Sequence, residues 1–165
     1  MEISAERPEH VEAIRFLTTA AFERAEHGSH MEAEIIDALR AAGALGLSLV
    51  AIDAGEPVGH AAFSPVMIDS AAGRWFGLGP LSVRPDRQGE GIGSALVRNG
   101  LEQLRSRGAE GCVVLGDPAY YGRFGFRGGS DLSFPDAPAQ YFQWLSFTGR
   151  PVSGTVSYHP AFSVS

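Results

Sequence analysis

The chain has 165 residues, a net charge of −6 at pH 7, 44% hydrophobic residues and 19% charged residues. This length suits one domain that buries about 70% of its unfolded surface, so we expect a single domain over residues 1–165. The acidic balance argues against a nucleic-acid partner and favours cationic ligands. No apolar run approaches the roughly 20 residues of a membrane span, so no membrane partner is expected.

Cysteine usage indicates a reducing compartment. The only cysteine, Cys112, excludes an internal disulfide bond, and the first residues, Met-Glu-Ile-Ser, show no secretion-signal pattern. We therefore expect a cytoplasmic protein. Cys112 lies in an apolar run and is expected to fill a buried strand position, where a thiol is inert.

Apolar spacing predicts two helices near the start of the chain. One runs over residues 8–23, with Pro8 in its first turn, and the other over about 30–42, ended by Gly43. The apolar residues that recur at threes and fours are Val11, Ile14, Leu17, Met31, Ile35 and Leu39.

Apolar runs then predict the strands. Leu47–Asp53 and Val58–Ile68 are separated by a turn composition at residues 54–57, which indicates a β-hairpin. Trp75–Val83 is the next strand, and Cys112–Leu115 is a short strand typical of one buried on both faces. We expect the order helix, helix, three strands, helix, strand, followed by a short helix and an aromatic-rich tail.

A glycine-rich turn links the strand ending at Val83 to a helix predicted over residues 94–107. Without Cβ atoms, its backbone N–H groups can close on one anion, and the helix N-terminus adds partial positive charge. The turn therefore predicts a phosphate cradle, although a plain strand-to-helix connection is the alternative. Its residues are Gln88, Gly89, Glu90, Gly91, Ile92, Gly93 and Ser94.

The type of phosphate site follows from the spacing of this turn. All 13 basic residues are arginines, so a Walker loop and a Schiff-base lysine are both excluded. Neither glycine register satisfies the dinucleotide fingerprint G-x-G-x-x-G. What remains is Q-x-x-G-x-G at Gln88, Gly91 and Gly93. Here the sequence resembles the GCN5-related N-acetyltransferases (GNAT), whose motif of this form binds the pyrophosphate of acetyl-CoA.

A second motif supports the resemblance. Asp117 and Pro118 are typical of a helix start, and Gly125 predicts its end. Tyr121 stands four residues before the pair Gly125-Phe126, as a tyrosine does in the family, whereas Asp117 departs from the asparagine of many members. The resemblance covers about residues 2–130, and the tail over 131–165, including 152–158, is compatible with the family's terminal strands. The chain looks most like predicted acetyltransferases with unassigned acceptors.

The resemblance implies an α/β GNAT acyl-CoA N-acyltransferase fold, with a mixed central sheet and helices on both faces. It implies acetyl-CoA as co-substrate, no metal, and direct attack by a primary amine in a ternary complex. CoA would lie in a V-shaped gap between the strand ending near Val83 and the strand at 112–115. Tyr121 would protonate the departing thiolate. The implied cofactor-binding residues are Leu81, Ser82, Val83, Gln88, Gly89, Glu90, Gly91, Ile92, Gly93, Ser94, Asp117 and Tyr121.

The general base is left open at this level. Glu26, His27 and His30 lie in the link between the first two helices, which borders the acceptor site in the family, and His60 lies on a strand. Glu26 ranks first and His60 second, because carboxylates and imidazoles titrate usefully near pH 7 when perturbed. His27 and His30 lack a third metal-ligand candidate nearby. For Tyr121, the alternative to a catalytic role is a position in the core. Arg84 and Arg87 are candidates for contact with CoA phosphates, and solvated surface charge is the alternative.

Three other functions stay open beside transfer to a small-molecule amine. These are acetylation of a protein amine, a non-catalytic acyl-CoA sensor, and an interaction domain without cofactor. The acyl length and the acceptor are not determined by the sequence. An aromatic-rich tail also leaves a homodimer open, as happens in this family. The tail aromatics that would wall a pocket or complete the core are Tyr141, Phe142, Trp144, Phe147, Tyr158 and Phe162.

Overall fold

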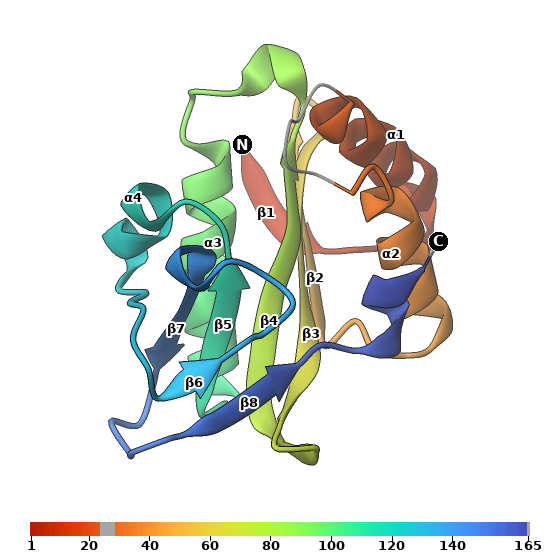
Figure 1. Ribbon diagram of the computed structural model, residues 1–165. Coiled ribbons are helices and arrows are strands. Elements are labelled where there is room, and N and C mark those ends of the chain that lie inside the picture. Colours follow the sequence, from red (N-terminus) through yellow and green to blue (C-terminus); the bar gives the residue numbers. More distant parts are fainter. Residues whose placement is uncertain (24–28, 165) are drawn as a thin grey trace.

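The computed structural model describes residues 1–23 and 29–164 (Figure 1). Its centre is a mixed sheet in which β4 and β5 are the parallel pair along the main row of strands, whose other neighbours are antiparallel. The strands, in spatial order, are β1 (Glu2–Ala5), β2 (Leu47–Asp53), β3 (Glu56–Ile68), β4 (Ala71–Val83), β5 (Gly111–Leu115) and β7 (Phe142–Ser146). Near the end of β3, β8 (Gly154–Ser157) pairs with both β3 and β6 (Leu132–Ser133).

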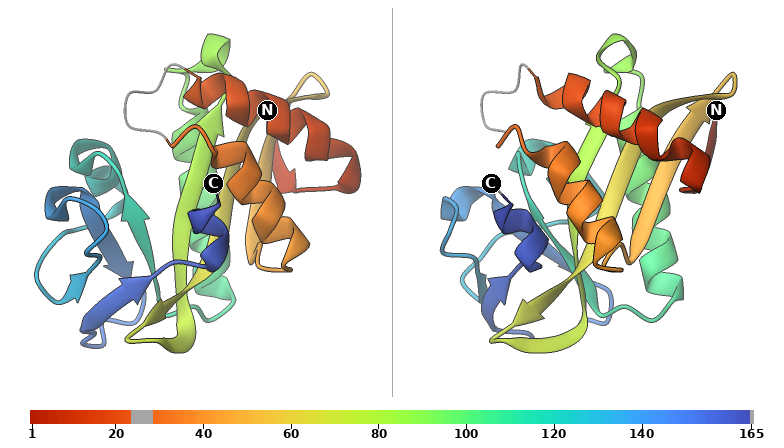
Figure 2. Two further views of the ribbon diagram at one scale, coloured as in Figure 1. Left: turned by 45° about the vertical axis from the view of Figure 1, so that its right-hand side comes forward. Right: turned by 90° about the vertical axis from the view of Figure 1, so that its right-hand side faces the viewer.

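Helices cover both faces of this sheet (Figure 2). α1 (Val11–Phe22) and α2 (Glu32–Ala41) lie on one face, and α3 (Ile92–Ser106) lies on the other. A short helix, α4 (Pro118–Tyr121), follows β5. The 3-10 turns are η1 (Pro8–His10), η2 (Pro85–Arg87), η3 (Gly122–Phe124), η4 (Ala139–Tyr141) and η5 (Pro160–Ser163). None of the described helices has the length and hydrophobicity that crossing a bilayer requires.

Both faces of the central strands are buried, which explains their continuous apolar sequences. Along β2, Leu49 belongs to the core cluster under α3, while Val50 packs with Ile14 of α1 and Ile36 of α2. Burial on two sides thus removes the polar alternation that a half-exposed strand would show.

The parallel strands β4 and β5 stop pairing before β4 ends. Pairing between β4 and β5 runs from Trp75 with Gly111 to Leu78 with Val114. Beyond Leu78, β4 continues to Val83, and among the described strands only β3 pairs with this last stretch. The register with β3 also shifts here, opposite Gly79 and Pro80. An unpaired strand edge therefore opens next to the glycine turn.

Most predicted elements are confirmed, with bounds shifted by a few residues. The expected order omits β1, with which the chain starts. β1 has only four residues, too few for a periodicity to be recognised. β7 lies within the tail over residues 131–165 that was compatible with terminal strands, although its bounds were not predicted. Within the tail, β8 lies inside the 152–158 segment that was compatible with a terminal strand.

Candidate functional site

The glycine turn forms the wall of a cavity of about 250 Å³ at the start of α3. Gly89 and Gly91 both adopt left-handed backbone conformations, with φ of 83° and 86°, and Gly91 is the residue before the first helical turn. These conformations disfavour any residue with a Cβ. The cavity is lined by Val83, Arg87, Gln88, Gly89, Gly91, Ile92, Gly93, Ser94, Tyr120 and Arg123.

Gln88 and Glu90 have side-chain contacts that hold the turn in place. The amide of Gln88 donates to the carbonyl oxygen of Val83 at 3.1 Å, which ties the turn to the end of β4. Glu90 pairs with Arg87 at 3.1 Å, and Arg87 also pairs with Asp53 on β2 at 2.8 Å. The carboxylate of Glu90 thus neutralises a neighbouring arginine, while the turn's backbone faces the cavity.

Two cavity residues, Tyr120 and Arg123, were not expected as part of the site. The guanidinium of Arg123 lies 4.4 Å from the centre of the Tyr120 ring and donates to Ser94 Oγ at 3.3 Å. A Cβ built on Gly93 would approach the Tyr120 hydroxyl to 2.9 Å. α4 therefore closes the cradle against α3, and η3, which follows it, brings a positive charge to the cradle. The signal in the sequence was their place one residue before and two after Tyr121.

Asp117 and Tyr121 occupy the two ends of α4. Asp117 Oδ1 accepts from the backbone N–H of Ala119 at 2.9 Å, which confirms the predicted helix cap. The Tyr121 ring packs against Gly116, where a Cβ would collide with it, and against Phe126, with ring centres 5.9 Å apart. Burial raises the pKa of the Tyr121 hydroxyl above its usual value. The hydroxyl therefore keeps its proton throughout the neutral range.

The last residues of β4 face opposite sides of the sheet. Leu81 and Val83 pack against the core under α3, the helix that follows the glycine turn. Ser82 is buried on the other face, where its hydroxyl donates to Thr18 Oγ1 of α1 at 3.2 Å. The end of β4 thus contacts the core under α3 on one face of the sheet and α1 on the other.

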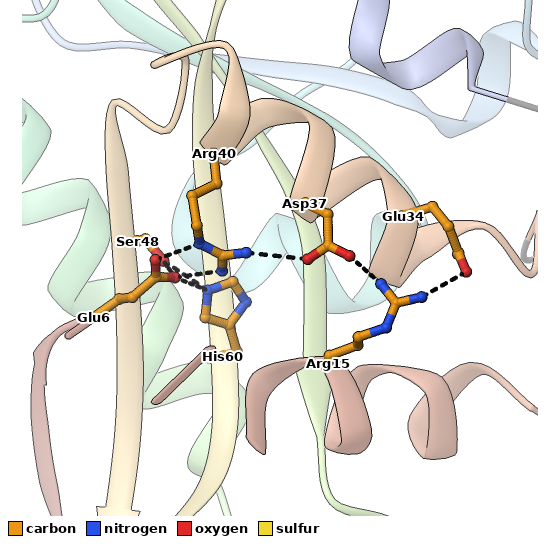
Figure 3. Close-up of polar contacts among 7 residues, drawn as sticks. All are labelled: Glu6, Arg15, Glu34, Asp37, Arg40, Ser48 and His60. Carbon is orange, nitrogen blue, oxygen red and sulfur yellow. Dashed lines mark hydrogen bonds and ion pairs between the residues drawn. The ribbon is translucent and has the colours of Figure 1, made fainter. Parts of the chain in front are cut away.

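The two candidate bases lie in different parts of the chain. Glu26, together with His27, is outside the described residues. His60 is completely buried on β3, in a polar network between the sheet and α2 (Figure 3). Its Nε2 lies 2.7 Å from Ser48 Oγ and 3.7 Å from Glu6 Oε1, and Arg40 Nε donates to Glu6 at 2.7 Å.

Hydrogen-bond geometry assigns the tautomer of His60. The Ser48 hydroxyl has one hydrogen, which it donates to Glu6 Oε1 at 2.7 Å, so Nε2 of His60 must be the donor to Ser48. Nδ1 is then a proton acceptor, and it has no hydrogen-bond partner among the described residues. Burial lowers the pKa of His60, and this effect exceeds the opposing influence of Glu6. The neutral ring is therefore favoured.

Three other groups considered in the sequence, Cys112, Arg84 and His30, do not line the cradle cavity. Cys112 is buried, and burial raises the pKa of its thiol, as expected for an inert position. Arg84 pairs with Asp86 at 2.7 Å. His30 is exposed, and residues 1–23 and 29–164 contain no group of three His, Cys, Asp or Glu side chains placed to hold a metal ion.

A mixed sheet that parts beside a glycine-lined phosphate cradle defines a class of protein, the acyl-CoA-dependent acetyltransferases. The chain belongs to this class: residues 7–126 match the model of the acetyltransferase (GNAT) family. An uncharacterized N-acetyltransferase of Escherichia coli strain K12, YhbS, is 40% identical over 170 residues, which cover 99% of both chains.

Solved structures of similar proteins agree with this assignment. A GNAT acetyltransferase from Brucella melitensis, crystallised with acetyl-CoA, is 52% identical, with a TM-score of 0.88 over 98% of this chain and 97% of that one. The crystal structure of Escherichia coli YhbS in complex with CoA is 35% identical, with a TM-score of 0.89 over 99% and 92% of the two chains. The chain is thus an acetyltransferase by family, and the predicted fold is confirmed.

Proposed function

We propose that this enzyme transfers the acetyl group of acetyl-CoA to a primary amine of a small molecule by direct attack in a ternary complex. The observation that carries the proposal is the convergence of the cradle, the unpaired edge of β4 and Tyr121 at the C-terminal end of the parallel pair. The relatives from Brucella melitensis and Escherichia coli that crystallised with acetyl-CoA and CoA support the same co-substrate.

The residues of the cradle suit the pyrophosphate of acetyl-CoA. Backbone N–H groups over residues 89–94 are fixed donors, and the helix dipole of α3 adds positive charge. Arg123 supplies a guanidinium, whose charged hydrogen bonds to phosphate are stronger than neutral ones. Gly93 leaves the space that a Cβ would fill. Together they accommodate an anion where an ordinary helix start would be closed by side chains.

The strand edge suits the pantetheine arm. An extended chain of amides can pair with the backbone of Leu81, Ser82 and Val83, as an added strand does. We assign the N–H near Leu81 to the thioester carbonyl oxygen, where one such donor is worth about 3 kcal/mol in comparable acyl transfers. Asp117 takes part indirectly by capping α4, which positions Tyr121.

The chemistry requires two proton transfers. Acetyl-CoA supplies an activated thioester: the amine nitrogen bonds to its carbonyl carbon, and the bond from carbon to sulfur breaks. The Tyr121 hydroxyl, held protonated, gives its proton to the departing sulfur. The attacking amine loses a proton to a base, for which Glu26 is the first candidate and His60 the second. The neutral ring and the unpartnered Nδ1 support His60, whereas its complete burial favours Glu26.

The proposal is tested first by binding. Calorimetric titration of the protein is expected to show micromolar binding of acetyl-CoA and CoA, and none of NAD. The Gly93→Ala variant is expected to weaken acetyl-CoA binding about tenfold, a loss of about 1.4 kcal/mol, because its methyl group meets the Tyr120 hydroxyl. Gly73→Ala is the matched control, since a Cβ there meets nothing within 4 Å.

Two results would count against the proposal. If neither acetyl-CoA nor CoA binds, both the enzyme and the sensor hypotheses fail. If both bind but no CoA is released with any amine of a broad panel, the non-catalytic sensor is the better description. Equal affinities of the Gly93→Ala and Gly73→Ala variants for acetyl-CoA would show that the pyrophosphate does not bind at the turn.

A further inference from the structure

A second cavity, of about 650 Å³, lies between α1 and α2, on the face of the sheet opposite the cradle. The hydrogen bond from Ser82 to Thr18 joins its floor to the unpaired end of β4. Thr18, which lines this cavity, thus contacts the strand that we assign to the pantetheine arm. It is lined by Glu12, Arg15, Phe16, Thr18, Thr19, Ala20, Phe22, Glu23, His30, Glu32, Ala33 and Glu34.

The cavity has an excess of negative charge. Four glutamates line it, against one arginine and one histidine. Within the described parts of the chain, Glu34 alone among the four forms an ion pair, with Arg15 at 3.2 Å, and Arg15 is further engaged by Asp37 (Figure 3). Among residues 1–23 and 29–164, the cavity's carboxylates thus outnumber the cations that pair with them.

Glu32 is the most informative of these side chains. It is only 8% exposed, and its Oε2 accepts from the N–H and the hydroxyl of Ser29 at 2.8 and 2.6 Å, in the turn before α2. Its Oε1 is buried and has no hydrogen-bond donor among residues 1–23 and 29–164. A buried carboxylate oxygen without a donor is costly, because its lost hydration is not replaced. The turn with Ser29 accounts for one oxygen of Glu32 and leaves the other without a donor among the described residues.

Apolar surface accompanies the charge. Phe16, which lines the cavity, is 75% exposed, which is unusual for a large aromatic side chain, and Phe22 and Ala33 add further apolar lining. Aliphatic chains bury their surface against such residues, and aromatic faces attract cations. The lining thus offers apolar surface for methylene groups as well as carboxylates for positive charge.

We propose that this cavity binds the amine acceptor and that the acceptor is a linear aliphatic polyamine with at least two ammonium groups. This inference rests on the proposed function, because it names the acceptor of the same reaction. One ammonium group compensates the charge of Glu32 and its neighbours, the methylene spacers contact the phenylalanines, and the far amine is directed toward β4.

Calorimetry with spermidine and n-butylamine tests this inference on the CoA-saturated protein. Spermidine is expected to bind at least tenfold more tightly than n-butylamine, with an affinity that falls as sodium chloride is raised, because the attraction is electrostatic. The Glu32→Gln variant is expected to lose about tenfold for spermidine and little for n-butylamine. A glutamine keeps an oxygen that can accept from Ser29, so the start of α2 is preserved.

Glu9→Gln is the control, because Glu9 is an exposed carboxylate of η1 outside the cavity. Equal affinities for spermidine and n-butylamine, or an equal loss for both in Glu32→Gln, would overturn the inference. The measurement requires no turnover, so its failure is separate from that of the proposed function. If acetyl-CoA binds and spermidine does not, only the acceptor class is wrong.

Discussion

The Tyr121→Phe variant is expected to lower kcat about 100-fold, the lower end of what one positioned proton donor contributes. The substitution removes only the hydroxyl, so the ring keeps its contacts with Gly116 and Phe126. Affinity for acetyl-CoA, measured by calorimetry, is therefore expected to stay within about twofold. The rate is measured as CoA release at saturating acetyl-CoA, with the best acceptor of a panel of primary amines.

The control for this variant is Tyr141→Phe, which removes an equal hydroxyl from an exposed tyrosine of η4. It is expected to leave both kcat and affinity unchanged. A kcat of Tyr121→Phe equal to that of the wild type would show that Tyr121 is a core aromatic that seats α4. A loss of acetyl-CoA affinity as large as the loss of kcat would make it a binding residue instead.

The parts of the site that could be predicted are those determined by local sequence. The glycine turn and the start of α4 depend on backbone conformations and caps set within a few residues, so Gly91 and Asp117 were recognised without tertiary information. The strands β2 to β5 were recognised because burial on both faces produces apolar runs. The bounds of β7 and its place beside β5 were not predicted, because this pairing depends on a return of the tail that no local pattern indicates.

The polar network around His60 could not be predicted. Its members come from α2, β2, β3 and the residue after β1, and the hydrogen bonds between Arg40 and Glu6 join residues 34 positions apart. Nothing in the sequence near His60 indicates that Ser48 and Glu6 face it. Position on a strand therefore identified the residue, but only the fold shows that its ring is buried and that Nε2 is the donor.

The largest expected effect on stability comes from the Arg40→Met variant. Glu6 and Arg40 are joined by two hydrogen bonds, at 2.7 and 2.9 Å, and their side chains are only 12% and 25% exposed. Methionine keeps the bulk of the arginine stem but leaves the carboxylate of Glu6 without its cation. The free energy of unfolding at pH 7 is expected to fall by about 3 kcal/mol, as when one partner of a buried pair is removed.

The pH dependence of this loss distinguishes an uncompensated charge from lost packing. Burial alone would raise the pKa of Glu6, but the hydrogen bonds from Arg40 and Ser48, together with the nearby His60 ring, outweigh it and hold the pKa well below its usual range. In the wild type, Glu6 therefore contributes stability that is present above about pH 4.3, the unfolded value, and is lost as the pH falls toward the lower folded pKa. In Arg40→Met, burial dominates, and protonation of Glu6 relieves the penalty.

The difference in unfolding free energy between wild type and Arg40→Met is therefore expected to be largest near pH 7 and to shrink as the pH falls toward 4. His60 acts in the same direction, because Arg40 is one of the groups that lower its pKa, and a protonated ring can face Glu6 at 3.7 Å once Arg40 is gone. Urea titrations at several pH values measure the difference, with the exposed Arg7→Met as control. A penalty that stays constant from pH 7 to pH 4 would mean that Arg40 stabilises the fold through its stem, and that the charge of Glu6 is already balanced by Ser48 and His60.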